Sequence, residues 1–190
     1  MAILASTPDR SRTPCLAGLL PLLLCVIAVA GTVEAQVTDE YKLKAAFLYN
    51  FGKFVTWPSS SFKGPNAPFV ICIIGDDPFG QALDDAVVGR TVDGRVLRIV
   101  RITELSKGGV CQILFVDSSE RKRVAAILAA LPPTGILTVG ESVGFAASGG
   151  MLNFILSDGH LKFEINRGAA ERGGLRISSR LLTLGQIIDK

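Results

Sequence analysis

Short runs of consecutive apolar residues recur along the chain at intervals that suit a layered domain. The run FVICII (69–74) is β-branched and continuous, as expected for a strand buried on both faces. Three later runs have the same character and predict further strands: RVLRIVRI (95–102), CQILFV (111–116) and GILTV (135–139). Strands spaced in this way leave room for a helix in several of the connections.

Segments with helical spacing fall between and after these runs. The stretch 76–87 predicts a helix with Asp77 as its cap and Pro78 in its first turn. The stretch 118–131 predicts a second helix, capped by Ser118 or Ser119. Its apolar face comprises Val124, Ile127, Leu128 and Leu131. A last helix is predicted over 178–188, capped by Ser178 or Ser179.

The segment 151–166 predicts a β-hairpin. Asp158 and Gly159 stand between two alternating apolar runs, MLNFIL and HLKFEIN, and Asp-Gly is a strong signal for a tight turn. Strands alternating with helices and followed by a hairpin are typical of α/β proteins. The sequence therefore predicts an α/β layered single domain, with a mixed, mostly parallel sheet flanked by helices and a C-terminal β-hairpin and helix.

The stretch AAFLYNFGKFVTWP (45–58) holds five of the thirteen aromatic residues of the chain. On a helical wheel, Leu43, Leu48, Val55 and three of the phenylalanines share one face. Three interpretations are open: a helix lying in a membrane interface, a buried core helix, or a partner-binding surface. A membrane-surface helix normally has more Lys and Arg along its polar face, so a core helix is favoured. Lys44 falls within the apolar arc and must snorkel or find a partner.

The first 35 residues have the three parts of a secretory signal peptide. Polar residues with Arg10 and Arg12 precede the apolar run LAGLLPLLLCVIAVA (16–30), and small residues then lead to a cleavage site between Ala35 and Gln36. The apolar run is short for a membrane-spanning helix, and it contains Pro21. We expect residues 1–35 to be removed and 36–190 to form one exported domain, with the periplasm as its compartment.

Net charge and cysteine content bear on the class of partner and on the presence of a disulfide. The net charge of +3 is too small to indicate nucleic acid as a partner. Once the signal peptide is removed, Cys72 and Cys111 are the remaining cysteines. Two such cysteines tend to pair in an oxidising compartment, whereas the alternative is two buried thiols at strand positions.

Candidate catalytic chemistry is sparse. GESVG (140–144) matches the G-x-S-x-G pattern after a predicted strand, and Asp158 and His160 follow in the order that a serine hydrolase requires. The glycine-rich residues after Ser142 lead into a strand rather than a helix, which argues against this hypothesis. The Asp76-Asp77 and Asp84-Asp85 pairs are better explained by helix capping and solvent exposure than by a metal site. No catalytic residue, metal site or cofactor is expected.

Several stretches, in this order, resemble the YfiR family, also known as the DUF4154 domain. They are YKLKAAFLYNFGKFVTWP, VICIIGDDPFG, CQILFV, GGMLNF and KFEIN, followed by the ISSRLL segment. The resemblance implies an α/β fold, a disulfide between Cys72 and Cys111, and a homodimer. Some members carry a second cysteine pair in the region that matches residues 145–153, and this chain has none there. Redox control through such a second pair is therefore not expected.

The resemblance also implies a function. The best-studied members of the family are periplasmic proteins without enzymatic activity that bind the periplasmic sensor domain of an inner-membrane diguanylate cyclase. They thereby lower cyclic di-GMP and limit biofilm formation, and an outer-membrane OmpA-like lipoprotein sequesters them. We expect this chain to be such a negative regulator. The alternative is a periplasmic module that binds a small ligand and reports to another membrane sensor, such as a histidine kinase.

The arginine-rich C-terminal region is the candidate surface for the partner. Arg176 and Arg180 lie there, and Glu164 precedes them at the end of the predicted hairpin. Arginine is enriched at interfaces because its guanidinium can bind a carboxylate through two hydrogen bonds. The alternative is a solvated face with weak local ion pairs. Glu164, Arg176 and Arg180 are the predicted partner-binding residues.

Overall fold

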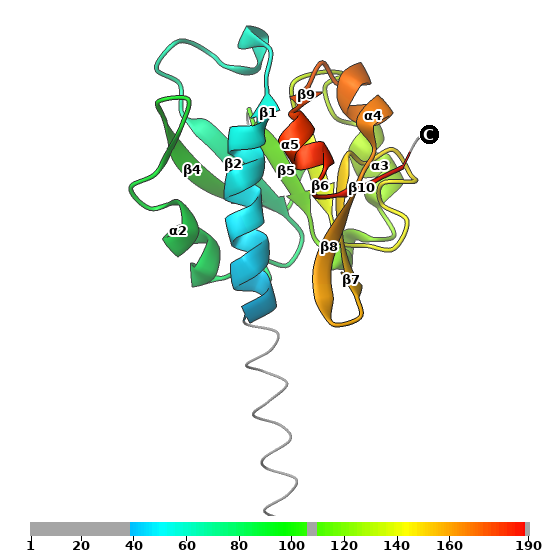
Figure 1. The fold of residues 1–190 in the computed structure, drawn as a ribbon. Coiled ribbons are helices and arrows are strands. Elements are labelled where there is room, and N and C mark those ends of the chain that lie inside the picture. The colour runs from blue at the N-terminus through cyan, green and yellow to red at the C-terminus, as the bar shows by residue number, and fades with distance from the viewer. Residues whose placement is uncertain (1–38, 106–109, 189–190) are drawn as a thin grey trace, which may run out of the picture. The chain divides into compact units, whose positions relative to one another are not determined.

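The computed structural model describes residues 39–105 and 110–188, and this part of the chain forms an α/β domain (Figure 1). The predicted signal peptide, and with it the proposed cleavage between Ala35 and Gln36, lies outside the described residues. Within them, a sheet of eight strands has the order β10-β8-β7-β6-β5-β2-β4-β3. The fold class predicted from the sequence is confirmed.

The centre of the sheet is parallel. Its strands are β2 (Phe69–Ile74), β4 (Arg95–Ile102), β5 (Ile113–Val116), β6 (Leu137–Gly140) and β7 (Leu152–Ser157). The first of them, β2, pairs with β4 on one side and with β5 on the other. The chain therefore steps outward to β4 and then returns across β2, as in doubly wound α/β folds.

Antiparallel and short strands complete both ends of the sheet. The predicted hairpin is present: β8 (His160–Ile165) pairs with β7, and its turn holds Asp158 and Gly159 at positive φ. Strand β10 (Gln186–Ile187) forms one edge by pairing with β8, and β3 (Thr91–Val92) pairs with β4 at the other. Outside this sheet, β1 (Val55–Thr56) pairs with β9 (Arg176–Ile177).

The aromatic stretch forms a core helix, as favoured from the sequence. We call residues 39–54 the aromatic helix. Phe47 and Phe51 contact Phe154 of β7 and Phe163 of β8, at ring-centroid distances of 5.4–6.1 Å. Phe51 is 0% exposed, whereas Leu43, which the wheel placed on the same face, is 47% exposed. The aromatic helix thus covers one face of the sheet and anchors the hairpin to it.

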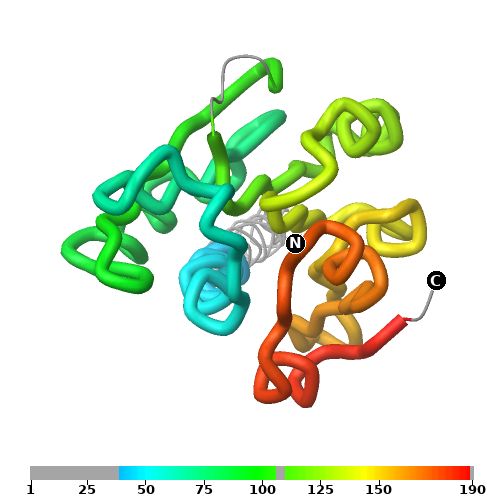
Figure 2. The backbone as a smooth tube through the Cα atoms, turned by 90° about the horizontal axis from the view of Figure 1, so that it is seen from above, coloured from blue at the N-terminus to red at the C-terminus, as the bar shows by residue number. Residues whose placement is uncertain are grey.

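Helices cover both faces of the sheet (Figure 2). The aromatic helix, α2 (Gln81–Val87) and α5 (Ser179–Leu182) contribute to the larger core on one face. The helix α3 (Val124–Ala129) lies on the other face, where Val124 and Ile127 pack against a second core that contains both cysteines. The helix α4 (Arg167–Arg172) begins after the hairpin, where the Asn166 side chain accepts a hydrogen bond from the Ala169 amide.

Two helix starts differ from the sequence prediction. Asp77 does not cap α2: its carboxylate accepts the Phe79 amide, and α2 begins at Gln81. Gly80 intervenes with φ 49° and ψ −130°, a backbone conformation outside the helical region. Neither Ser118 nor Ser119 caps the next helical segment, because Asp117 accepts the Ser119 amide and a short 3₁₀ turn (Ser118–Glu120) precedes α3.

The last predicted helix is much shorter than expected. Ser178 caps α5 as predicted, but the helix ends at Leu182 and the chain continues into β10. Gly185 marks the change, since a Cβ at this position would lie 2.6 Å from the Phe163 ring. The close approach to β8 forces the chain to leave the helical path and pair with the sheet.

Candidate partner-binding surface

The C-terminal region places Arg176 and Arg180 at the surface. Arg176 lies in β9, opposite Thr56 of β1, and Arg180 lies in α5. Both side chains are exposed, and the Arg180 guanidinium lies 5.6 Å from the centre of the Phe54 ring. In the described part of the chain, neither arginine has a carboxylate partner. Both guanidinium groups are therefore free to bind an acidic group of another molecule.

Glu164 belongs to a different environment. Its carboxylate accepts a hydrogen bond of 2.9 Å from the side-chain amide of Asn153, a residue that is buried in β7. Asn153 lies between Leu152 and Phe154, whose side chains face the aromatic helix, so Asn153 and Glu164 point to the opposite face of the sheet. The structure does not bring Glu164 together with Arg180, which contacts the aromatic helix itself.

Sequence reasoning missed the apolar part of this surface. Leu184 is 62% exposed and Ile187 is 42% exposed, and both fall within the stretch 178–188 that the sequence predicted to be one helix. With Arg176 and Arg180 they make up what we call the C-terminal surface. It covers β9, α5 and β10, which are coloured red and orange in Figure 1. Because β10 is an edge strand, its outer backbone groups have no neighbouring strand.

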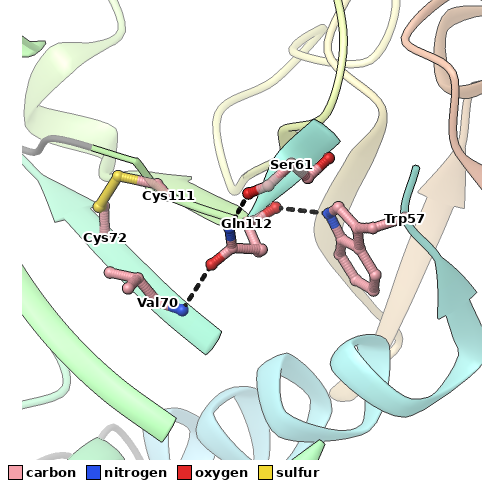
Figure 3. Close-up of a disulfide and its surroundings, with 6 residues drawn as sticks. All are labelled: Trp57, Ser61, Val70, Cys72, Cys111 and Gln112. Atoms are coloured by element: carbon pink, nitrogen blue, oxygen red, sulfur yellow. Dashed lines mark hydrogen bonds between the residues drawn. A yellow bond between two sulfur atoms is a disulfide. The ribbon is translucent and has the colours of Figure 1, made fainter. Parts of the chain in front are cut away.

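The two cysteines form a disulfide, with their Cα atoms 5.8 Å apart (Figure 3). It links Cys72 of β2 to Cys111, which lies two residues before the start of β5. Gln112 is itself buried: its side chain accepts the Val70 amide at 2.7 Å and donates to the Ser61 carbonyl at 2.5 Å. Its own carbonyl accepts a hydrogen bond from the Trp57 indole. The disulfide and Gln112 together fasten the amino ends of β2 and β5.

A buried ion pair occupies the opposite, carboxyl edge of the parallel strands. Lys44 of the aromatic helix and Glu141, which follows β6, are 2.7 Å apart, and each side chain is only 5% exposed. Lys44 also pairs with Glu40, and the Tyr41 hydroxyl lies 3.3 Å from both Glu141 oxygens. The sequence indicated one half of this pair, because Lys44 falls on the apolar face of the predicted helix and there needs a partner. Its partner, 97 residues later, was hidden within the GESVG motif.

Burial alters the acid–base properties of this cluster. Desolvation raises the pKa of Glu141 above its ordinary value of 4.5, although the hydrogen bond and charge of Lys44 partly oppose the shift. Desolvation also raises the pKa of Tyr41, and the negative charge of Glu141 adds to the effect. The cluster joins the aromatic helix to the end of β6. Its charged groups pay a larger desolvation penalty than those of an ordinary surface ion pair.

In doubly wound folds, ligands usually bind where the chain order reverses, at the carboxyl ends of the strands. Here this position lies between β2 and β5. Ser119 accepts a hydrogen bond from the Asp76 amide at 3.1 Å, and a Cβ on Gly75 would lie 2.7 Å from the Ser119 hydroxyl. The segments that follow β2 and β5 therefore pack directly on each other next to Gly75.

Comparison with protein families identifies the chain. The family model described as YfiR/HmsC-like (DUF4154) matches residues 41–186, which is nearly all of the described domain. The chain belongs to the YfiR/HmsC-like family. A comparison with curated proteins gave no significant match. The family implies a periplasmic regulator of cyclic di-GMP signalling, whose domain is regulatory rather than catalytic.

The hydrolase motif does not form a triad in this YfiR/HmsC-like domain. Ser142 lies in a series of turns after β6, and its buried hydroxyl has no hydrogen-bond partner within the part of the chain that the structure describes. Asp158 and His160 lie together in the exposed hairpin turn, where a ring nitrogen of His160 is 2.8 Å from the Asp158 carbonyl. The serine and the histidine are thus not hydrogen-bonded, and the loop does not lead into a helix as a nucleophile elbow requires.

The aspartate pairs have other roles. Asp77 and Asp84 both bind the guanidinium of Arg101, at 2.5 and 2.7 Å, and these hydrogen bonds raise the pKa of Arg101. Over residues 39–105 and 110–188, no group of three or more His, Cys, Asp or Glu side chains is arranged to hold a metal ion. The same residues contain no helix long and apolar enough to cross a bilayer.

Proposed function

We propose that this chain binds the periplasmic sensor domain of an inner-membrane diguanylate cyclase and holds the enzyme inactive, which lowers cyclic di-GMP. Family membership supports the signalling pathway. The observation that supports a binding role is the C-terminal surface, where two arginines without a carboxylate partner among the described residues accompany two exposed aliphatic side chains. Buried apolar area with arginine at its margin is a common composition of protein interfaces.

The open edge of β10 suggests how a partner would bind. An extended segment of the sensor domain can pair with β10 through its backbone, while Leu184 and Ile187 are covered and Arg176 and Arg180 meet acidic side chains. Within the same proposal, an outer-membrane OmpA-like lipoprotein competes for the regulator, and the regulator acts as a homodimer after export through a cleaved signal peptide.

Inhibition requires a difference in affinity between two states of the cyclase. A regulator that binds the inactive state more tightly shifts the population toward that state. About 5.5 kcal/mol of difference moves such an equilibrium from about 1:99 to about 99:1. No turnover and no cofactor are needed, so the regulator acts in proportion to its amount.

The test is a deletion strain complemented with variants of the full chain. Deletion should raise cyclic di-GMP and surface attachment, and the unaltered chain should restore both. Arg176→Glu and Arg180→Glu should fail to restore them while leaving the melting temperature unchanged, because surface substitutions usually cost within about 0.5 kcal/mol.

Arg121→Glu provides the matched control, since Arg121 is an exposed arginine that lies outside the C-terminal surface. It should restore regulation fully. If both C-terminal charge reversals regulate as well as Arg121→Glu does, the partner binds elsewhere. If deletion leaves cyclic di-GMP unchanged, the proposed pathway is wrong.

A further inference from the structure

One part of the sheet face opposite the aromatic helix is not covered by any helix of the described residues. Val70 and Cys72 of β2 share this face with their register partners Arg98 and Val100 of β4. Toward the carboxyl end of these strands, Ile74 and Ile102 are buried in the second core. Toward the amino end, Val70 and Val100 are only partly buried and Arg98 is exposed. A cavity of about 210 Å³ lies over these amino-terminal positions.

The outer wall of the cavity is held in place by the protein. The segment that contains Phe62, Lys63 and Ala67 forms this wall. Arg95 donates hydrogen bonds to the carbonyls of Gly64 and Ala67, at 3.0 and 2.7 Å, and its guanidinium lies 4.0 Å from the centre of the Phe62 ring. The wall is therefore formed before any ligand binds, which reduces the entropy cost of binding.

The inner wall depends on the disulfide. Val110 and Gln112 line the cavity, and Cys111 stands between them in the chain. The bond from Cys111 to Cys72 fixes this segment against β2, and the Gln112 side chain adds hydrogen bonds to Val70 and Ser61 (Figure 3). The oxygen and the nitrogen of the Gln112 side chain are both used in these bonds, so this side chain is held in a fixed position along the cavity.

The charged residues of the cavity are all cationic. Among the described residues, Lys63 and Arg98 line it, no acidic side chain does, and neither cation has an ion-pair partner. The floor between them is aliphatic, formed by Val70, Val100 and Val110. An apolar floor with two cations at its margin is complementary to a small molecule that has an apolar body and one carboxylate.

We propose that this cavity binds a small amphipathic carboxylate, with Arg98 and Lys63 holding the carboxylate and the three valines contacting the apolar body. The guanidinium of Arg98 can form two parallel hydrogen bonds to a carboxylate, and Lys63 adds a second positive charge. The volume is below the range of about 300–1,000 Å³ typical of drug-sized ligands, so the ligand is a small acid. The site is separate from the C-terminal surface and does not depend on the proposed function.

Cinnamate and cinnamyl alcohol make a matched pair of probes, because they share the apolar body and differ in the carboxylate. Titration of the purified full chain, followed by calorimetry or by amide NMR shifts, should give saturable binding of cinnamate at one site. Cinnamate should bind about tenfold or more tightly than cinnamyl alcohol, the difference expected when a charge-assisted hydrogen bond is gained.

Arg98→Gln should reduce this preference for the carboxylate severalfold while leaving binding of the alcohol unchanged. Arg90→Gln is the control, since the Arg90 guanidinium lies over the Tyr49 ring, away from the cavity, and this variant should keep the preference. Val110→Trp, which fills the cavity, should abolish binding of both probes. The absence of saturable binding, or an undiminished preference in Arg98→Gln, would overturn the proposal.

Discussion

The carboxyl group of Glu141 is largely removed from water at the carboxyl edge of the sheet, since its side chain is only 5% exposed. Lys44, Tyr41 and Asp117 face it, and Glu40 shares the lysine. Replacing any one partner alters the electrostatic interactions of the others, because the low local dielectric screens these groups poorly. Glu141 and Lys44 thus act as one electrostatic unit that joins the aromatic helix to β6.

This unit should produce a measurable pH dependence. Because the pKa of Glu141 is raised in the folded state, its contribution to stability is greatest below its ordinary value of 4.5 and is lost as the pH rises through the folded pKa. Between about pH 5 and about pH 8, the wild-type melting temperature should fall relative to that of Glu141→Gln, whose amide cannot ionise. If the melting temperatures of the two proteins change with pH in parallel across this range, the pKa of Glu141 is not raised in the folded state.

Of the two residues in this electrostatic unit, the sequence singled out only Lys44. Lys44 stood out because a charged side chain on an apolar helix face needs a partner. Glu141 did not, since it lies 97 residues away and no local pattern connects the two. Arg176 and Arg180 were predicted correctly to lie at the surface, but their separation from Glu164 depends on which face of the sheet each side chain takes.

At the scale of elements, the aromatic helix contributes most of its apolar face to the core. Phe51→Ala removes a fully buried ring that contacts Phe154 and Phe163, so it should lower the free energy of unfolding by about 3–5 kcal/mol. Chemical denaturation measures this change. Leu43→Ala, on an exposed part of the same helix, should change it by less than about 0.5 kcal/mol.

A Phe51→Ala protein that keeps its stability but loses regulation would contradict the core assignment and assign the helix to partner binding. The core assignment was available from sequence because helical spacing repeats over several turns. The end of α5 was not. Leu184 and Ile187 continue a helical pattern, yet contact between Gly185 and β8 redirects the chain, and periodicity carries no record of that contact.

At the scale of the whole molecule, the disulfide spans 39 residues and encloses α2, β3 and β4. Replacing both cysteines by serine should lower the free energy of unfolding by about 4 kcal/mol in the chain-entropy model. A reducing agent should lower the melting temperature of the wild type and leave that of the double variant unchanged. Two titratable thiols in the unreduced, denatured mature protein (36–190), which lacks Cys15 and Cys25, would contradict the presence of the bond.

The position of the aromatic helix at the start of the domain also affects when the protein can fold. Phe51 packs on Phe154, about a hundred residues later, so the Phe51 face of the helix lacks this partner until the hairpin has been synthesised. At about 5–20 residues per second, the ribosome leaves this helix without its partner for roughly 5–20 s. During that interval its aromatic face is available to a holding chaperone. If the chain is exported as its sequence predicts, a core that closes this late favours passage through a translocation channel, which requires an unfolded chain.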